Sequence, residues 1–132
     1  MLRSENTIRV LICNKYTLFR EGIKAMLASG GEIEVAGETS YAMQAIGMLA
    51  EIRPHVVLMD LVLPDLSGWE ATRRIKEIAP DVEVLIVPLS DDQPMLLLCL
   101  KAGAAGHVRT NDLPRQLTSA IQNAYMRGAH AA

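Results

Sequence analysis

Asp60 is the residue in this sequence whose type and setting most favour chemistry. The apolar run Val56–Met59 precedes it, and Pro64 and Gly68 follow it. A continuous apolar run bounded by Pro and Gly is typical of a strand buried on both faces of a parallel sheet. We therefore expect the Asp60 carboxylate at the carboxyl edge of that sheet, where open α/β sheets place their ligands.

Strand-like and helix-like segments alternate five times along the chain and would position that carboxylate. Strands are predicted over residues 8–13, 33–37, 56–60 and 82–87, with a short fifth strand within 103–108. Helices are predicted around residues 19–27, 42–49, 71–78, 92–101 and 114–125. Five βα units with short links predict an α/β fold, a doubly wound five-stranded parallel sheet flanked by five helices.

Several residues mark where the predicted helices begin and end. Gly30-Gly31 is expected to stop the first helix. Arg53-Pro54 is expected to end the second, because a residue before proline disfavours the α region. Asp92 is expected to cap the fourth helix, with Pro94 tolerated in its first turn.

Length, composition and charge describe one ordinary globular domain. The 132 residues are 50% hydrophobic and carry a net charge of -2, which excludes disorder and gives no basic field for nucleic acid. The basic group Arg73, Arg74 and Lys76 is interpreted as a solvated helix face. We expect a domain over residues 1–127 and the start of a linker or tail at 128–132.

Cysteine usage and hydropathy predict a cytoplasmic protein without a cofactor. Cys13 and Cys99 both fall in apolar segments, which fits reduced thiols rather than a disulfide scaffold. No His, Cys or Asp arrangement has metal-ligand spacing. The start of the chain lacks a signal-like apolar segment, and no stretch approaches the length of a membrane span.

Five stretches resemble, in order, the receiver domain of two-component response regulators. They are Ile8–Ile12, Leu18–Gly22, Leu58–Leu61 with Pro64 and Gly68, Glu70–Ile75 and Ala102–Gly106. The likeness is to the NarL/LuxR-type subfamily of transcription regulators and covers essentially the whole chain. It implies the flavodoxin-like fold of receivers, and it implies that Asp60 stands where the family accepts a phosphoryl group from a histidine kinase.

The other residues of the family's site are replaced in this chain. Phosphoryl transfer depends on positioning and charge neutralisation, and Mg²⁺ requires hard oxygen ligands. The family provides an acidic pair, a Ser or Thr, and a Lys, whose positions here hold Asn14 and Lys15, Pro88, and Thr110. We therefore interpret Asp60 as a vestigial phosphoacceptor in a degenerate pocket, with weak or absent Mg²⁺ binding and no catalytic activity.

Lys15 and His107 are the two departures with a further interpretation. We expect the ammonium group of Lys15 to form a charge pair with Asp60, or to lie within one water of it; the alternative is that Lys15 points into solvent. His107 replaces the aromatic residue that reports the switch in many family members. We interpret His107 as a packed or surface histidine rather than a pH sensor.

The predicted fourth helix is apolar on more than one side. Leu96 and Leu100 are expected to face the sheet, while Met95, Leu98 and also Leu97 point away. Because exposed apolar patches usually mark partner surfaces, Met95 and Leu98 are predicted interface residues. The competing surface, by resemblance to some LuxR-type members, is the first helix.

These features favour a pseudo-receiver that is not an enzyme. It would act as a homodimer, or as a heterodimer with another regulator, and control a DNA-binding effector outside this chain, without binding nucleic acid or membrane itself. One alternative is a small-molecule sensor with Trp69, Asn14 and Lys15 as contacts, although half-exposed packing is the simpler interpretation of Trp69. A conventional phosphoacceptor with an altered phosphorylation route is another. A flavin-binding flavodoxin-like protein is disfavoured, because no Ser/Thr/Gly-rich loop follows the first strand.

Overall fold

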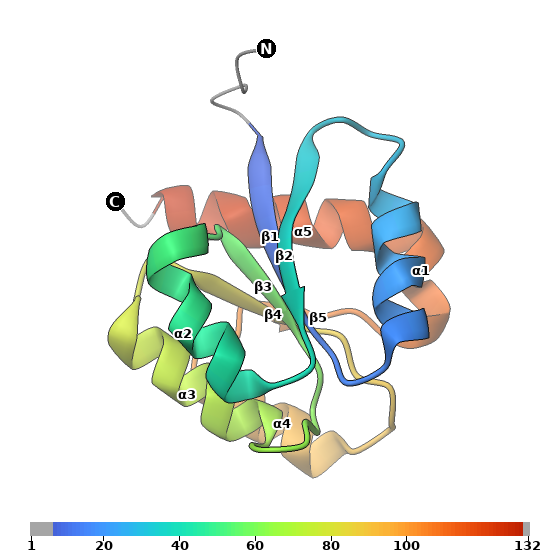
Figure 1. The fold of residues 1–132 in the computed structure, drawn as a ribbon. Coiled ribbons are helices and arrows are strands. Elements are labelled where there is room, and N and C mark those ends of the chain that lie inside the picture. Colours follow the sequence, from blue (N-terminus) through green and yellow to red (C-terminus); the bar gives the residue numbers. More distant parts are fainter. Residues whose placement is uncertain (1–6, 131–132) are drawn as a thin grey trace.

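Five strands form one parallel sheet at the centre of the protein, of which the computed structural model describes residues 7–130 (Figure 1). The strands are β1 (Ile8–Cys13), β2 (Ile33–Thr39), β3 (Val56–Met59), β4 (Glu83–Ile86) and β5 (Gly106–His107). Their order is β2-β1-β3-β4-β5, and every pairing is parallel. The predicted fold class is confirmed.

Helices cover both faces of this sheet. They are α1 (Thr17–Leu27), α2 (Ala42–Ile52), α3 (Gly68–Ile78), α4 (Gln93–Lys101) and α5 (Leu113–His130), with a short 3₁₀ turn at Thr110–Asp112. Figure 1 shows α1 and α5 on one face and α2, α3 and α4 on the other. Within residues 7–130 no helix is long and apolar enough to cross a membrane.

The chain reverses its direction of winding between β1 and β3, which are neighbours in the sheet. After β2 the chain returns past β1 to build β3, β4 and β5 on the other side. In open α/β sheets the crevice at such a switch point, outside the carboxyl ends of the strands, is the usual binding position. Asp60 follows the last residue of β3 and therefore lies at this edge.

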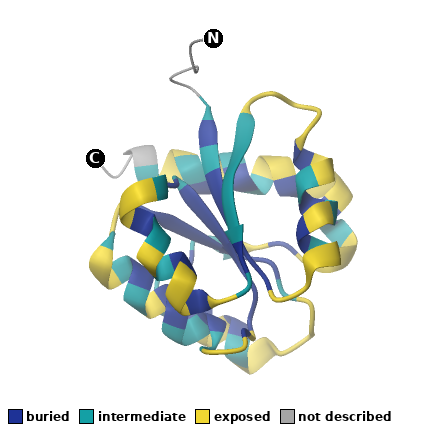
Figure 2. Cartoon of the chain, in the orientation of Figure 1, coloured by how far each residue is buried: buried dark blue, intermediate teal, exposed yellow. Residues whose placement is uncertain are grey.

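Burial on both faces explains why β3 and β4 are apolar throughout their centres. Val57 and Met59 belong to the hydrophobic cluster under α2, α3 and α4. Val56 and Leu58 belong to the cluster under α1 and α5. Figure 2 shows the buried strands between helices whose outer surfaces are exposed.

Most of the predicted helix ends are confirmed by the capping contacts. The Asp92 side chain accepts a hydrogen bond from the Met95 N–H at 3.1 Å. The α2 helix ends at Ile52, and Arg53 has a left-handed φ of 53°. The α5 helix continues to His130, past the domain end expected at residue 127. That boundary stays a prediction.

Both cysteines are buried and free, as their apolar surroundings predicted. Burial, with the charges of Asp65 and Asp60 adding to it, raises the pKa of Cys13 to about 12. Burial alone raises the pKa of Cys99 to about 11. Both side chains are therefore uncharged thiols at neutral pH and contribute as small apolar groups.

Gly68 allows α3 to begin directly against the strand end that carries Asp60. Its N–H donates to the Leu61 carbonyl at 2.7 Å. A Cβ at position 68 would lie 2.2 Å from the Asp60 carbonyl oxygen and 3.0 Å from the Leu61 Cα. Any side chain there would push the helix away from the candidate site.

We expect Gly68→Ala to lower the free energy of unfolding by about 1–3 kcal/mol, the usual cost of overpacking. Gly47→Ala is the matched control, because Gly47 lies inside α2 with nothing within 4 Å of its added Cβ. The control should gain about 0.5–1 kcal/mol through helix propensity. Urea unfolding of both variants measures the difference, and equal effects at the two positions would contradict the close approach.

Candidate functional site

Asp60 is buried at the carboxyl edge of the sheet and its carboxylate already has hydrogen-bond donors. The side-chain oxygen Oδ1 accepts from the Leu61 N–H at 2.6 Å and from the Leu89 N–H at 3.2 Å. The residue is only 5% exposed. Burial raises the pKa of Asp60, while the two backbone N–H groups and the charge of Lys15 act against that rise.

Asn14 and Lys15 occupy the loop between β1 and α1. The Asn14 side chain is buried, and its Oδ1 accepts from the Tyr16 N–H at 2.8 Å. Lys15 is exposed, and its ammonium nitrogen lies 5.2 Å from the centroid of the Tyr16 ring. The amide of Asn14 therefore stabilises its own loop, and the cation of Lys15 packs on an aromatic face.

The predicted charge pair between Lys15 and Asp60 is not formed as a direct contact. Within the described residues no ion pair joins them, although the positive charge of Lys15 still lowers the pKa of Asp60 against the larger effect of burial. The attraction of the Tyr16 ring offers a physical reason, because it holds the ammonium group in the solvent-exposed part of the loop.

Pro88 and Thr110 meet at the same edge on the other side of Asp60. The Thr110 hydroxyl donates to the Pro88 carbonyl at 2.7 Å. The Val87 N–H donates to the Met59 carbonyl at 2.8 Å. Pro88 and Thr110, which the resemblance assigns to the family's hydroxyl and lysine positions, thus form a contact that joins the segment after β4 to the 3₁₀ turn before α5.

A polar cavity of about 460 Å³ lies between the β4–α4 loop and the β5–α5 loop. Its walls include Ser90, His107 and Arg109, all of which are exposed, and Leu61, but not Asp60. His107 is therefore a surface residue, as predicted. Ser90 and Arg109 face this cavity rather than the Asp60 carboxylate.

The three contacts predicted for a small-molecule ligand do not line one large cavity. Trp69 is partly buried and packs against the hydrophobic core. Neither the polar cavity nor an apolar groove beside α1 includes Trp69, Asn14 or Lys15 in its walls.

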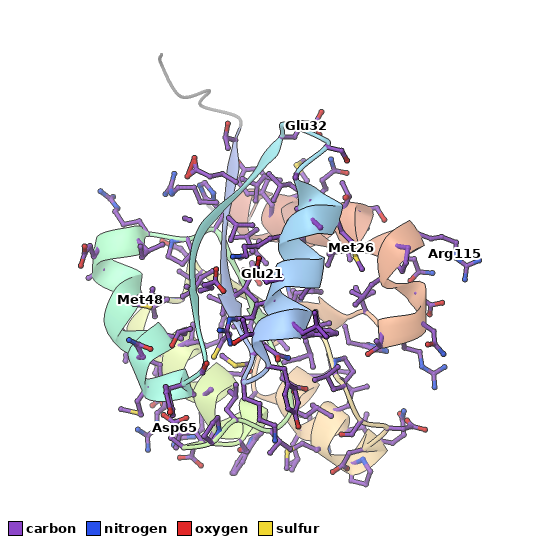
Figure 3. The ribbon with its side chains drawn as sticks, turned by 45° about the vertical axis from the view of Figure 1, so that its right-hand side comes forward. Glu21, Met26, Glu32, Met48, Asp65 and Arg115 are labelled. Carbon is purple, nitrogen blue, oxygen red and sulfur yellow. The ribbon has the colours of Figure 1, made fainter. Side chains whose placement is uncertain are left out.

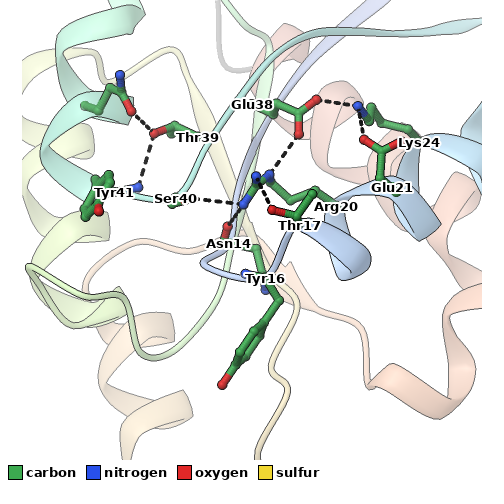
Figure 4. Close-up of polar contacts among 11 residues, drawn as sticks. Asn14, Tyr16, Thr17, Arg20, Glu21, Lys24, Glu38, Thr39, Ser40 and Tyr41 are labelled. Carbon is green, nitrogen blue, oxygen red and sulfur yellow. Dashed lines mark hydrogen bonds and ion pairs between the residues drawn. The ribbon is translucent and has the colours of Figure 1, made fainter.

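Arg20 supplies the buried cation at this edge, which sequence reasoning missed (Figure 4). The residue is 9% exposed, and its guanidinium group donates to the Asn14 carbonyl at 2.6 Å and to Glu38 at 2.8 Å. It also contacts the hydroxyl groups of Ser40 at 3.0 Å and Thr17 at 3.2 Å. The contacts tie α1 to the ends of β1 and β2.

Glu38 is held as a carboxylate in this cluster. The Lys24 side chain, followed by Arg20, lowers the pKa of Glu38. Arg20 lies within the stretch Leu18–Gly22, which resembles the receiver family, so the sequence did contain a signal for it. Residue spacing alone does not predict which residues at the end of β2 contact Arg20.

Asp65 is the second missed residue, and it caps α2 from a distant loop. Its two carboxylate oxygens accept from the Ala42 and Met43 N–H groups, each at 2.9 Å. Figure 3 shows Asp65 beside the start of α2. Although burial raises its pKa, the backbone N–H groups of Met43, Ala42, Asp65 itself and Leu66 together lower the pKa of this carboxyl.

The residues around Asp60 do not fit a magnesium ion. Mg²⁺ takes hard oxygen ligands, usually including carboxylates. Here the Asn14 oxygen is engaged by its own loop, and Lys15 places a positive charge nearby. Within residues 7–130 no three or more His, Cys, Asp or Glu side chains are grouped to hold a metal.

Two apolar surfaces lie near this site, on α4 and on α1. On α4, Leu97 is 55% and Leu98 is 40% exposed, whereas Met95 packs partly against the core. The predicted outward position of Met95 is thus only partly realised. On α1, an apolar groove of about 540 Å³ runs along Tyr16 and Met26 to the β4–α4 loop and the start of α5.

The basic group on α3 is largely neutralised by its own helix. Arg73 contacts Glu70 and Glu77, and Arg74 contacts Glu70. These pairs at spacings of three and four residues fit a solvated helix face.

The sheet order, the buried aspartate after β3 and the loops around it agree with the matches to known proteins. Residues 10–122 match the family described as the response regulator receiver domain. The chain belongs to that family. The receiver is 34% identical over 127 residues to the "Transcriptional regulatory protein DegU" of Brevibacillus brevis, covering 96% of this chain and 54% of that protein.

Further similar proteins are response regulators as well. The receiver is 33% identical over 118 residues to the "Response regulator UvrY" of Escherichia coli (strain K12), covering 89% of this chain and 54% of that protein. The crystal structure of a LuxR-family two-component response regulator from Aurantimonas sp. SI85-9A1 superposes with a TM-score of 0.85 at 29% identity, covering 92% of this chain and 86% of that one. The chain spans about half the length of these curated relatives.

We expect Asp60→Asn to raise the stability of the receiver at pH 7. The folded pKa of Asp60 lies above the ordinary value of 3.8, so the wild type loses stability as the pH rises from 3.8 through that folded pKa. An Asn keeps an acceptor oxygen without a buried charge, and its advantage should vanish below pH 3.8. Asp60→Ala should instead cost about 1–3 kcal/mol, because two N–H groups lose their acceptor.

Urea unfolding of the wild type and both variants between pH 3 and pH 8 checks this expectation. The Asn variant provides the matched control for the Ala variant, since the two differ in the retained oxygen. A wild type that gains stability relative to the Asn variant as the pH rises would contradict the direction of the pKa shift.

Proposed function

We propose that this receiver is a regulatory module that works without Mg²⁺-dependent phosphorylation of Asp60. One observation carries the proposal: the Asp60 carboxylate accepts backbone N–H groups from both the β3–α3 and β4–α4 loops. The β4–α4 loop is thus already attached to the unmodified carboxylate. Asn14 and Lys15 in place of the acidic pair support the same proposal, because they replace two hard anionic ligands with an amide and a cation.

The effector of this module is proposed to be a DNA-binding domain in a longer protein. The curated relatives are named as a transcriptional regulatory protein and as response regulators, and each is nearly twice as long as the matched region. This receiver would supply the regulatory half. Its own charge and the neutralised α3 surface support control of an effector rather than direct contact with DNA.

Self-association, or pairing with another regulator, is proposed to act through the face of α4, β5 and α5. Leu98 is an exposed apolar anchor there, Met95 contributes its partly exposed side chain, and His107 lies on the adjoining strand. Apolar side chains near the centre of an interface carry much of its free energy. The exposed apolar residues of α1, such as Leu18 at 85% exposure, form the competing surface.

We predict that small phosphodonors leave Asp60 unmodified in the presence of Mg²⁺. The expected adduct of a phosphorylated protein is a mass increase of about 80 Da. Intact-mass spectrometry after incubation with acetyl phosphate measures it, with peptide mapping to locate any adduct. A Mg²⁺-dependent adduct on Asp60 would instead support a conventional phosphoacceptor.

A variant with the acidic pair restored is the matched control. Asn14→Asp combined with Lys15→Asp adds two carboxylates at the positions that the family uses. This double variant should bind Mg²⁺ more tightly than the wild type in a titration followed by Trp69 fluorescence. Equal, measurable Mg²⁺ binding by the two proteins would argue against the proposed role of positions 14 and 15.

We also predict that the unphosphorylated protein self-associates and that Leu98→Glu weakens the dimer at least about tenfold. A tenfold change corresponds to about 1.4 kcal/mol, a common cost of losing an apolar anchor. Sedimentation of both proteins at matched concentrations measures it. Leu18→Glu tests the competing α1 surface with the same change in charge.

The pair of variants separates the two faces. A dimer lost in Leu98→Glu and retained in Leu18→Glu supports the α4 face, and the reverse pattern assigns association to α1. Monomers for the wild type up to several hundred micromolar would contradict self-association and leave pairing with another regulator.

A further inference from the structure

Leu89 connects Asp60 to a surface on the other side of its loop. Its backbone N–H donates to Asp60 Oδ1 at 3.2 Å. Its side chain, which is partly exposed, lines the apolar groove of about 540 Å³ together with Phe19, Met26 and Leu113. Figure 3 shows Met26 on α1 in the space between α1 and α5. A single residue therefore belongs both to the hydrogen bonds of Asp60 and to the wall of this groove.

The segment that carries Leu89 has few other attachments. Between Val87, which follows β4, and Asp92 at the cap of α4, the described hydrogen bonds to other parts of the protein are the one to Asp60, the one from Thr110 to the Pro88 carbonyl and the one from the Gln93 side chain to Asp91. Pro88 has no N–H to donate. Loss of the Asp60 acceptor would leave the Pro88–Leu89 part of the segment held by Thr110.

The Thr110 contact and the Asp60 contact hold the two ends of one peptide group. The Pro88 carbonyl, which accepts from Thr110, and the Leu89 N–H, which donates to Asp60, belong to the same planar unit. Two hydrogen bonds together fix the orientation of this plane, whereas one alone lets the plane turn about the remaining bond. The position from which the Leu89 side chain reaches the groove therefore depends on the bond to Asp60 as well as on the bond from Thr110.

We propose that Asp60 is a positioning residue that fixes Leu89 and thereby sets the shape of the apolar groove beside α1. Any change at Asp60 that removes its acceptor oxygen then alters the groove, at a distance from the carboxylate itself. This coupling deepens the proposed function, since it gives a receiver without phosphorylation a route from its sheet edge to its α1 surface. It does not depend on which face of the protein associates.

Nuclear magnetic resonance of the whole chain tests this coupling through the Leu89 amide and the methyl groups of Leu89 and Met26. In Asp60→Ala the Leu89 amide should exchange with solvent about tenfold faster or more, and both methyl signals should shift. In Asp60→Asn, which keeps an acceptor oxygen, the methyl signals should stay near their wild-type positions.

Asp65→Ala is the matched control. Asp65 also accepts backbone N–H groups from another element at this edge, but these come from Ala42 and Met43 of α2. It should change the signals of Ala42 and Met43 and leave the groove methyl groups in place. Equal shifts of the groove methyl signals in Asp60→Ala and Asp65→Ala would overturn the proposal, because they would reflect a general loss of stability.

Two further results would also overturn the proposal, and neither requires Asp60→Ala to fold. The first is a Leu89 amide that exchanges without protection in the wild type, since the bond to Asp60 would then be absent. The second is a set of groove methyl signals that shifts as much in Asp60→Asn as in Leu89→Ala.

A further contradicting result applies when Asp60→Ala folds. If its Leu89 amide then exchanges faster while the groove methyl signals stay unchanged, the loop moves without the groove and the coupling is wrong.

Discussion

The hydrogen bonds to one buried carboxylate oxygen organise the carboxyl edge of this sheet. Asp60 Oδ1 accepts from Leu61 in its own loop and from Leu89 in the neighbouring loop. An ionised carboxylate is expensive to bury, and donors of this kind are what make its burial tolerable. Gly68 then allows α3 to pack against the backbone of Asp60 itself. The positions of two loops therefore depend on this side chain, and the start of α3 depends on the backbone of the same residue.

At the position that the resemblance assigns to the family's lysine, Thr110 contacts a backbone carbonyl. Arg20 instead places a guanidinium group below the β1–α1 loop, where Asn14, Glu38 and two hydroxyl groups surround it. A planar guanidinium with several donors suits such a fixed arrangement better than a flexible ammonium group. Hydrogen bonds and ion pairs within the protein therefore stabilise the carboxyl edge of the sheet.

The sequence predicted the fold well because its signals are local. Apolar runs, Arg53-Pro54 and the Asp92 cap each depend on near neighbours in the chain, and the structure confirms them. The contacts made by the candidate site residues were not predicted. Lys15 was expected to reach Asp60, yet the adjacent Tyr16 ring holds its ammonium group. Arg20 and Asp65 were missed because Glu38, which pairs with Arg20, and the α2 N–H groups that donate to Asp65 lie 18 to 23 residues away and are brought close by strand pairing and loop packing.

The Asp65 cap has a consequence for the order in which this domain is built. The carboxylate that accepts the Ala42 N–H in the first turn of α2 belongs to Asp65, 23 positions later in the chain. During synthesis from the amino end, α2 therefore emerges before the residue that completes it. An isolated helix of 11 residues is marginal in water, so α2 has little reason to persist alone. The hydrogen bonds that complete its first turn must wait until β3 has joined the sheet and brought its following loop into place.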